Sequence, residues 1–176
     1  MRKLLVLSTA AFALALTAPA FADTVTGTDA AETLNGTASA DVISALGGDD
    51  TVYAAAGNDV VSGGTGDDYL YGGIGADRLK GGQGSDRLWG QRGDDKLVDA
   101  QGTTVDLLRG GAGDDVIFGN YRDVIFGGPG NDRIVVAYPD RMTVNCGRGS
   151  DTVIFNQAHP HVLLLGCEHV RIMSAG

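Results

Sequence analysis

The chain contains 176 residues, of which 28 are glycine, 6% are aromatic and 20% are charged. This length is enough for one ordinary domain, but so much glycine and so few aromatic side chains argue against a conventional hydrophobic core. The formal net charge of −9 argues against nucleic acid and anionic membranes as partners, because their phosphates require a basic patch, and it favours cations.

The first segment, 1–22, predicts a secretory signal peptide. A basic start, Arg2-Lys3, precedes an apolar run from Leu4 to about Leu16 and the small-residue ending Ala20-Phe21-Ala22. Its removal takes away two basic residues and no acid, so the formal charge becomes −9 − 2 = −11. No later apolar run approaches the roughly 18 residues of a membrane-spanning helix. We therefore expect a secreted, extracellular protein without membrane insertion.

The rest of the chain repeats with a period of nine residues. The frame Gly63-Gly-Thr-Gly-Asp-Asp-Tyr-Leu-Tyr71 sets the register, in which the sixth residue is acidic and the eighth is Leu, Ile or Val. Further frames with an intact or nearly intact glycine pattern begin at Gly72, Gly81, Gly90, Gly110 and Gly127. A period this long predicts a stack of repeated structural units rather than an ordinary mixture of helices and strands.

The frame also extends beyond these copies, with interruptions. Towards the N-terminus it persists to Glu32, although the paired glycines fade. It gains two residues at Asp99-Ala100, loses one near Asn120 and breaks between Tyr138 and Asn145. One last frame, Cys146–Ile154, restores it.

The pattern Gly-Gly-x-Gly-x-Asp-x-(aliphatic)-x resembles the repeat of the hemolysin-type, or RTX, calcium-binding proteins, and it covers most of the mature chain. Several tandem copies in one frame are hard to obtain by composition bias. The resemblance implies an all-β fold, a right-handed parallel β-roll (β-solenoid) of nonapeptide repeats with 18 residues per coil. In that fold the first six residues of a repeat turn and bind Ca²⁺, and the last three form a short strand. We expect this roll over 23–154 and a C-terminal cap over 155–176.

Elementary geometry supports the same fold. A three-residue strand directs one central side chain to the interior, so the aliphatic eighth residues must form the core. The sixth-position acids then form two rows, one on each side of the roll, and like charges one strand spacing apart repel strongly. Half of a ~4.8 Å spacing is about 2.4 Å, which matches the roughly 2.3–2.6 Å of Ca–O bonds and exceeds the ~2.0–2.1 Å that Mg²⁺ requires. We therefore predict that several Ca²⁺ ions are bound by Asp59, Asp68, Asp77, Asp86, Asp95, Asp106, Asp115 and Asp132.

The remaining acids are weaker candidates. Few or no ions are expected at Glu32, Asp41 and Asp50, because their frames lack the first glycine pair. A second set of acids occupies the fifth position: Asp49, Asp67, Asp94 and Asp114. They are either further ligands or solvated carboxylates, and we favour the second interpretation.

The only two cysteines, Cys146 and Cys167, are expected to form a disulfide that ties the last repeat to the tail. In an exported chain this is favoured over a catalytic thiol or a zinc site. The apolar stretches Val162–Leu165 and Val170–Ile172 lack repeat character and predict a strand pair that caps the open end. The histidines match no zinc spacing and are expected at the surface: His159, His161 and His169.

Aromatic side chains at the seventh and ninth positions leave two interpretations open. They either cover an exposed sheet, which we favour, or form a stacked stripe for carbohydrate. The residues concerned are Tyr53, Tyr69, Tyr71, Trp89, Phe118 and Phe126.

The predicted function is calcium ion binding by a secreted β-roll, coupled to folding. The alternative is an extracellular adhesion, glycan or surface interaction module that uses Ca²⁺ only structurally. An enzyme is not expected, because the 176 − 22 = 154 mature residues are almost all repeat and contain no catalytic signature. RTX enzymes carry their activity in a separate domain. An N-terminal signal peptide departs from the family's usual one-step export and favours general secretion by a bacterium.

Overall fold

The computed structural model describes residues 22–99, 104–156 and 161–173. The predicted signal peptide therefore lies outside the described residues, except for Ala22. Within the described ranges the chain forms seventeen β-strands and no α-helix, and no helix there is long and apolar enough to cross a membrane. The expected all-β parallel β-roll is confirmed.

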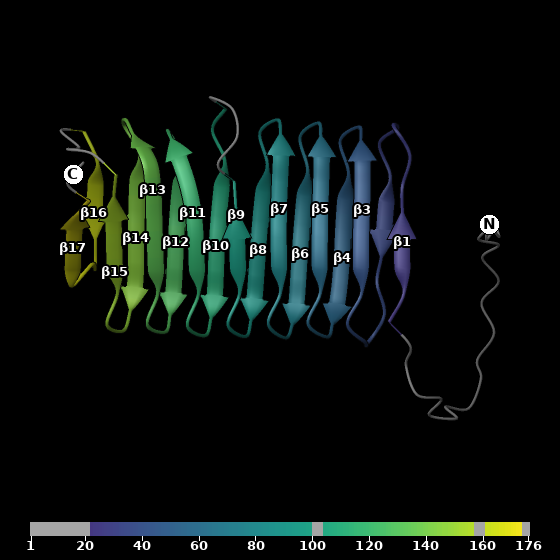
Figure 1. The fold of residues 1–176 in the computed structure, drawn as a ribbon, viewed down its shortest axis with the longest axis horizontal. Coiled ribbons are helices and arrows are strands. Elements are labelled where there is room, and N and C mark those ends of the chain that lie inside the picture. Colours follow the sequence, from purple (N-terminus) through teal and green to yellow (C-terminus); the bar gives the residue numbers. More distant parts are fainter. Residues whose placement is uncertain (1–21, 100–103, 157–160, 174–176) are drawn as a thin grey trace.

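The strands alternate along the chain between two parallel sheets and form one elongated stack (Figure 1). The nine-stranded sheet contains β1 (Thr24–Thr26), β3 (Val42–Gly47), β5 (Val60–Thr65), β7 (Arg78–Gln83), β9 (Lys96–Val98), β11 (Val116–Tyr121), β13 (Arg133–Pro139), β15 (Thr152–Phe155) and β17 (His169–Ile172). The eight-stranded sheet contains β2 (Thr33–Asn35), β4 (Thr51–Ala56), β6 (Tyr69–Ile74), β8 (Arg87–Arg92), β10 (Leu107–Ala112), β12 (Val124–Pro129), β14 (Thr143–Arg148) and β16 (Leu163–Leu165). The turns that join the sheets lie along two opposite edges of the stack (Figure 1).

The eighth residue of each repeat fills the interior, as predicted from the strand geometry. These side chains form two ladders, one from each sheet; thirteen of them are at most 1% exposed, while Leu34, near the N-terminal end, is only partly buried. The thirteen are Ile43, Val52, Val61, Leu70, Leu79, Leu88, Leu97, Leu108, Ile117, Ile125, Ile134, Val144 and Val153. The core is therefore one aliphatic side chain thick on each side.

Most strands have six residues rather than the three that the repeat predicts. β6 pairs with β8 over Tyr69–Tyr71, and the pairing resumes at Gly73 and Ile74. The ladder thus continues into the glycine turn. It does so because the second residue of the turn takes a positive φ, 115° at Gly73, which glycine adopts without strain.

The spacing between paired strands follows the predicted insertion and deletion. Arg87 of β8 pairs with Leu107 of β10, and the adjoining acids are 20 residues apart instead of 18. Leu107 in turn pairs with Val124 of β12, where the separation is 17. Both irregularities are confirmed by these pairings, and next to the second one the pairing of β11 with β13 shifts in register between Gly119 and Tyr121.

The expected irregularity and the expected tail strands are both present in the C-terminal part. The frame is interrupted between Tyr138 and Asn145, where Asp132 and Asp151 are 19 residues apart and the buried Met142 takes the place of an acid, but β13 and β14 stay in their sheets. The two tail strands are β16 and β17, and they extend the two sheets, since β16 pairs with β14 and β17 pairs with β15. Parallel ladders are made by main-chain groups, so these strands stack even where the glycines are missing.

The predicted disulfide is confirmed. Cys146 and Cys167 are joined with a Cα–Cα distance of 5.2 Å. Cys146 is buried in β14, while Cys167 lies between β16 and β17. The bond therefore ties the last coil to the body of the roll.

Candidate metal centre

Two rows of buried aspartates run along the two turn edges of the roll. Each aspartate precedes a strand, and its side chain is at most 2% exposed. One row lies before the odd-numbered strands and contains Asp41, Asp59, Asp77, Asp95, Asp115, Asp132 and Asp151. The other lies before the even-numbered strands and contains Asp50, Asp68, Asp86, Asp106 and Asp123.

One carboxylate oxygen of each aspartate fastens neighbouring coils together. The Asp59 amide donates to Oδ1 of Asp77 at 2.8 Å, and the Asp77 amide donates to Oδ1 of Asp95 at 2.8 Å. The other row has the same arrangement, for example from Asp68 to Asp86 at 2.8 Å. These hydrogen bonds fix the orientation of each carboxylate.

The second carboxylate oxygen is left without a hydrogen-bond partner within the described part of the chain. This holds for all eight aspartates predicted as ligands and for two further ones, Asp50 and Asp151. A buried and unpartnered carboxylate oxygen is costly, and such groups in proteins are normally paired or bound to a metal. Each of these ten aspartates therefore presents a buried oxygen whose charge a cation would compensate.

The first glycine of each turn leaves room next to this oxygen. A Cβ at Gly63 would overlap Oδ2 of Asp68 and would lie 2.9 Å from the main-chain oxygen of Gly81 in the next coil. A Cβ at Gly72 would likewise overlap Oδ2 of Asp77 and lie 2.9 Å from the oxygen of Gly90. Carboxylate and main-chain carbonyl oxygens thus face the same small space, and this all-oxygen donor set is what Ca²⁺ prefers.

Burial makes these carboxylates unusually weak acids in the absence of a cation. It raises the pKa of Asp68 and of Asp95 to about 7 and that of Asp77 to about 6. The main-chain hydrogen bonds to these groups act in the opposite direction, and the charges of neighbouring aspartates add to the increase. A cation in the turn would favour the ionised forms and reverse these shifts.

Three acids of the same rows differ because a nearby amide already occupies the second oxygen. The Thr37 amide donates to Oδ2 of Asp41 at 2.6 Å, and the Asn120 amide donates to Oδ2 of Asp123 at 2.6 Å. The Thr28 amide donates to Oε2 of Glu32 at 2.7 Å. These contacts agree with the weak ranking of Glu32 and Asp41.

Few or no ions were expected at Asp50, and Asp151 and Asp99 were not selected, but all three have a buried carboxylate oxygen without a partner among the described residues. The frame alone identifies Asp50 and Asp151, since both occupy the sixth position. Asp99 occupies a first position, where the frame calls for glycine, so only its departure from the pattern marks it.

The fifth-position acids are exposed and form a separate ladder. The Ser85 amide donates to Oδ1 of Asp67 at 2.8 Å, and the Asp114 amide donates to Oδ1 of Asp94 at 2.8 Å. In this ladder the later coil donates to the earlier one, whereas in the buried rows the earlier coil donates to the later. The two sets of hydrogen bonds thus join each turn to the coils before and after it, and the fifth-position acids have a structural role.

Four of the six aromatic residues, Tyr53, Tyr69, Tyr71 and Trp89, stack on the outer face of the eight-stranded sheet, whereas Phe118 belongs to β11 of the other sheet. The ring centroids of Tyr53 and Tyr71 are 4.9 Å apart, and those of Tyr71 and Trp89 are 4.5 Å apart, with interplanar angles of 9° and 5°. The ring faces therefore cover one another, which supports the interpretation that they protect the sheet. Arg87 lies over the ring of Tyr69 with its Cζ 4.8 Å from the centroid.

The two described histidines, His161 and His169, are exposed, as expected, while His159 lies outside the described residues.

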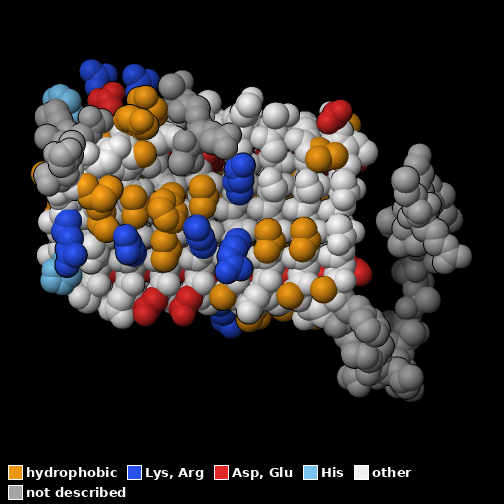
Figure 2. All heavy atoms as spheres, viewed as in Figure 1, with side chains coloured by type: hydrophobic (Ala, Val, Ile, Leu, Met, Phe, Trp, Pro, Cys, Tyr) orange, Lys and Arg blue, Asp and Glu red, His pale blue; other side chains and the backbone are white. Residues whose placement is uncertain are grey.

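Figure 2 shows hydrophobic and basic side chains interspersed over the visible sheet face, with acidic side chains mainly near its borders.

A parallel β-solenoid with stacked aspartates in its glycine turns defines the class of calcium-binding repeat rolls. The family profile of the RTX calcium-binding nonapeptide repeat (4 copies) matches residues 26–61, 62–97 and 102–134. These segments make up more than half of the chain, and the chain belongs to this family. No curated protein matches the chain.

Proposed function

We propose that this protein is a secreted calcium-binding roll whose ions are held between successive coils and drive its folding. The observation that supports this most strongly is the row of buried Oδ2 atoms without partners in the described residues. The ligands we assign are the carboxylates of Asp59, Asp68, Asp77, Asp86, Asp95, Asp106, Asp115 and Asp132, together with main-chain oxygens of the adjoining turns.

The coupling to folding follows from the charge of the rows. Without cations, the stacked carboxylates must either be protonated or repel one another. The core contains one aliphatic side chain per strand, so its burial contributes little free energy to offset this repulsion. If each site binds at the ~10⁻⁴ M end of extracellular modules, millimolar Ca²⁺ contributes roughly 1.4 kcal/mol per site, and about five sites supply on the order of 7 kcal/mol. That is comparable to the stability of a whole domain.

The proposed location is outside the cell, after export by a bacterium with the aid of the segment 1–22. The disulfide between Cys146 and Cys167 supports this location, because such bonds persist in oxidising compartments. The matched family is a calcium-binding repeat rather than a family of enzymes. Calcium ions are therefore the partners we assign, and the function proposed is not catalytic.

The test is isothermal titration of the mature chain with Ca²⁺, accompanied by circular dichroism and NMR. We expect several ions to bind and a disordered apo chain to gain β-structure with Ca²⁺ but much less with Mg²⁺. Absence of calcium binding would refute the function. A well-dispersed NMR spectrum in chelator that does not change on adding Ca²⁺ would refute the coupling to folding.

A further inference from the structure

One turn of the roll carries an aspartate in place of its first glycine. Asp99 directly follows β9 and occupies the position that Gly81 holds one coil earlier. In the sequence, two more residues separate Asp99 from Asp106 than separate Gly81 from Asp86, and Asp86 and Asp106 are 20 residues apart instead of 18.

A charged side chain is exceptional at this position. The first residue of a turn points into the roll, and the residues that replace glycine there are otherwise apolar and fully buried: Ala45, Ala54, Val136, Cys146 and Phe155. Asp99 is also buried, with 1% of its side chain exposed. Neither Oδ1 nor Oδ2 of Asp99 has a hydrogen-bond partner within the described ranges. A buried carboxylate with two unpartnered oxygens has a greater need for a cation than a carboxylate with one such oxygen.

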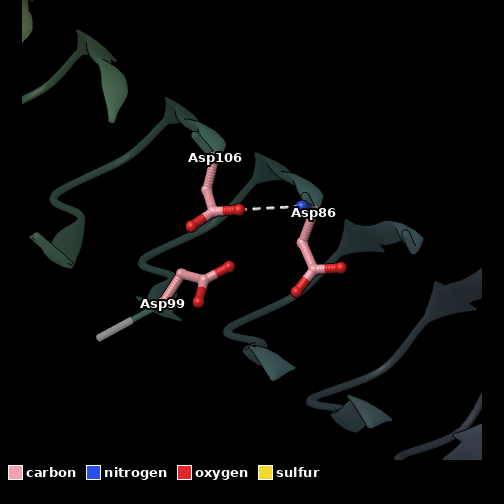
Figure 3. Close-up of side chains that lie close together, drawn as sticks. All are labelled: Asp86, Asp99 and Asp106. Carbon is pink, nitrogen blue, oxygen red and sulfur yellow. Dashed lines mark hydrogen bonds between the residues drawn. The ribbon is translucent and has the colours of Figure 1, made fainter. Parts of the chain in front are cut away.

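The Asp99 carboxylate is directed between two members of the buried row. Figure 3 shows it lying between Asp86 and Asp106, with one oxygen from each of the three residues within 4.8 Å of the others. A Cβ placed on Gly81 would lie 2.5 Å from Oδ2 of Asp86 and would also overlap Oδ2 of Asp99. The absence of that Cβ therefore creates the space in which these oxygens meet.

Main-chain hydrogen bonds hold the three residues in this arrangement. The Asp99 amide donates to the carbonyl of Phe118 at 2.9 Å, and the Asp86 amide donates to Oδ1 of Asp106 at 2.9 Å. Oδ2 of Asp86 and Oδ2 of Asp106 have no partner among the described residues. The three buried carboxylates lie close together and carry like charges, and a divalent cation among them would compensate both the burial and the repulsion.

We propose that Asp86, Asp99 and Asp106 form one three-carboxylate calcium site, which binds more tightly than the two-aspartate sites of the other turns and fills first. This inference rests on the proposed function, since it ranks one site among several. Ca²⁺ affinity rises with the number of charged ligands. A third carboxylate also suits a trivalent ion of similar size, so this site should prefer Tb³⁺ over Ca²⁺ more strongly than the other sites do.

The test compares the mature wild type with Asp99→Asn and Asp99→Gly, the second of which restores the residue found in neighbouring turns. The charge control is Asp29→Asn, because Asp29 is exposed and lies outside the site. Each protein is dialysed against a series of buffered free Ca²⁺ concentrations, and bound ions are counted by mass spectrometry. Circular dichroism in saturating Ca²⁺ verifies that each variant reaches the wild-type β-signal.

We expect both Asp99 variants to lose one ion from the tightest class, with at least a tenfold increase in its dissociation constant. Asp29→Asn should stay within twofold of the wild type. In competition, the preference of the tightest class for Tb³⁺ over Ca²⁺ should fall about tenfold in the Asp99 variants. If Asp99→Asn does not fold fully, Asp99→Gly supplies the comparison.

Two results would overturn the inference, and they are distinguishable. If the wild type binds several ions and both Asp99 variants retain the tightest class with unchanged Tb³⁺ preference, the three-carboxylate site is wrong while the proposed function stands. If the wild type binds no Ca²⁺, the proposed function and this site fail together.

Discussion

Asp77 offers the sharpest test of the assigned ligands, because its two oxygens have different roles. Oδ1 accepts the Asp59 amide at 2.8 Å, whereas Oδ2 is buried and has no partner among the described residues. In Asp77→Asn the amide oxygen can still accept from Asp59, but the new NH₂ group faces the metal space beside Gly72. The substitution therefore removes a charged ligand while preserving the contact between coils.

The magnitude follows from the number of sites that Asp77 serves. Its row continues to Asp59 on one side and Asp95 on the other at regular spacing, so under the proposed function the carboxylate would adjoin ions in two intervals. At roughly 1.4 kcal/mol per site in millimolar Ca²⁺, losing both would cost up to about 3 kcal/mol. We expect the Ca²⁺ midpoint of folding to rise severalfold or the number of bound ions to fall.

Glu32→Gln is the matched control. Oε2 of Glu32 accepts the Thr28 amide at 2.7 Å, and a glutamine oxygen can do the same, so the midpoint should hardly change. The assay is a Ca²⁺ titration followed by far-ultraviolet circular dichroism, together with an ion count at saturation. Equal shifts in both variants would mean that calcium forms a diffuse counterion atmosphere responding to net charge. Added salt separates the two cases, because an atmosphere is screened over about 8 Å at 0.15 M whereas coordinated ions remain.

Three further predictions concern pH, the disulfide and the aromatic ladder. Burial raises the pKa of Asp68 and Asp95 in the folded, metal-free roll from 3.8 to about 7, so protonation stabilises this roll fully below about pH 4 and the contribution is lost as the pH rises through 7. The β-signal that remains in chelator should therefore decrease between pH 5 and 8, and a signal independent of pH contradicts the reasoning. Reducing the bond between Cys146 and Cys167, which are 21 residues apart, should lower the free energy of unfolding by about 3 kcal/mol, and β16 and β17 should be the first strands to lose protection from hydrogen exchange. Free alkylation of both thiols in the unreduced native protein would rule the bond out. Trp89→Ala should lower the free energy of unfolding by about 0.5–1.5 kcal/mol beyond the loss of buried area, as measured by denaturant titration in saturating Ca²⁺, and it should leave the number of bound ions unchanged. If the wild type binds a glycan and this substitution abolishes the binding, the adhesion role is favoured instead.

The nine-residue period, together with its resemblance to the RTX repeat, was enough to predict the architecture. A strand places alternate side chains on opposite faces, so the invariable aliphatic eighth residue, such as Leu70 or Leu88, had to lie inside, and the sixth-position acids had to stack. The same frame located the insertion near Asp99 and the deletion near Asn120, because each extra or missing residue shifts every later acid. These features are local and repeat, which is why composition and spacing suffice for them.

The tertiary structure decided which acids retain a free oxygen. The frame treats Asp50 and Asp123 alike, yet Oδ2 of Asp123 accepts the Asn120 amide at 2.6 Å while that of Asp50 has no partner in the described chain. Whether an oxygen is satisfied depends on the path of a single shortened turn, which the period does not encode. The role of Asp99 depends on its approach to a carboxylate one coil earlier, across the space left by Gly81. Contacts between coils of unequal length arise only when the chain is folded, and the distinctive chemistry of this roll lies in those contacts.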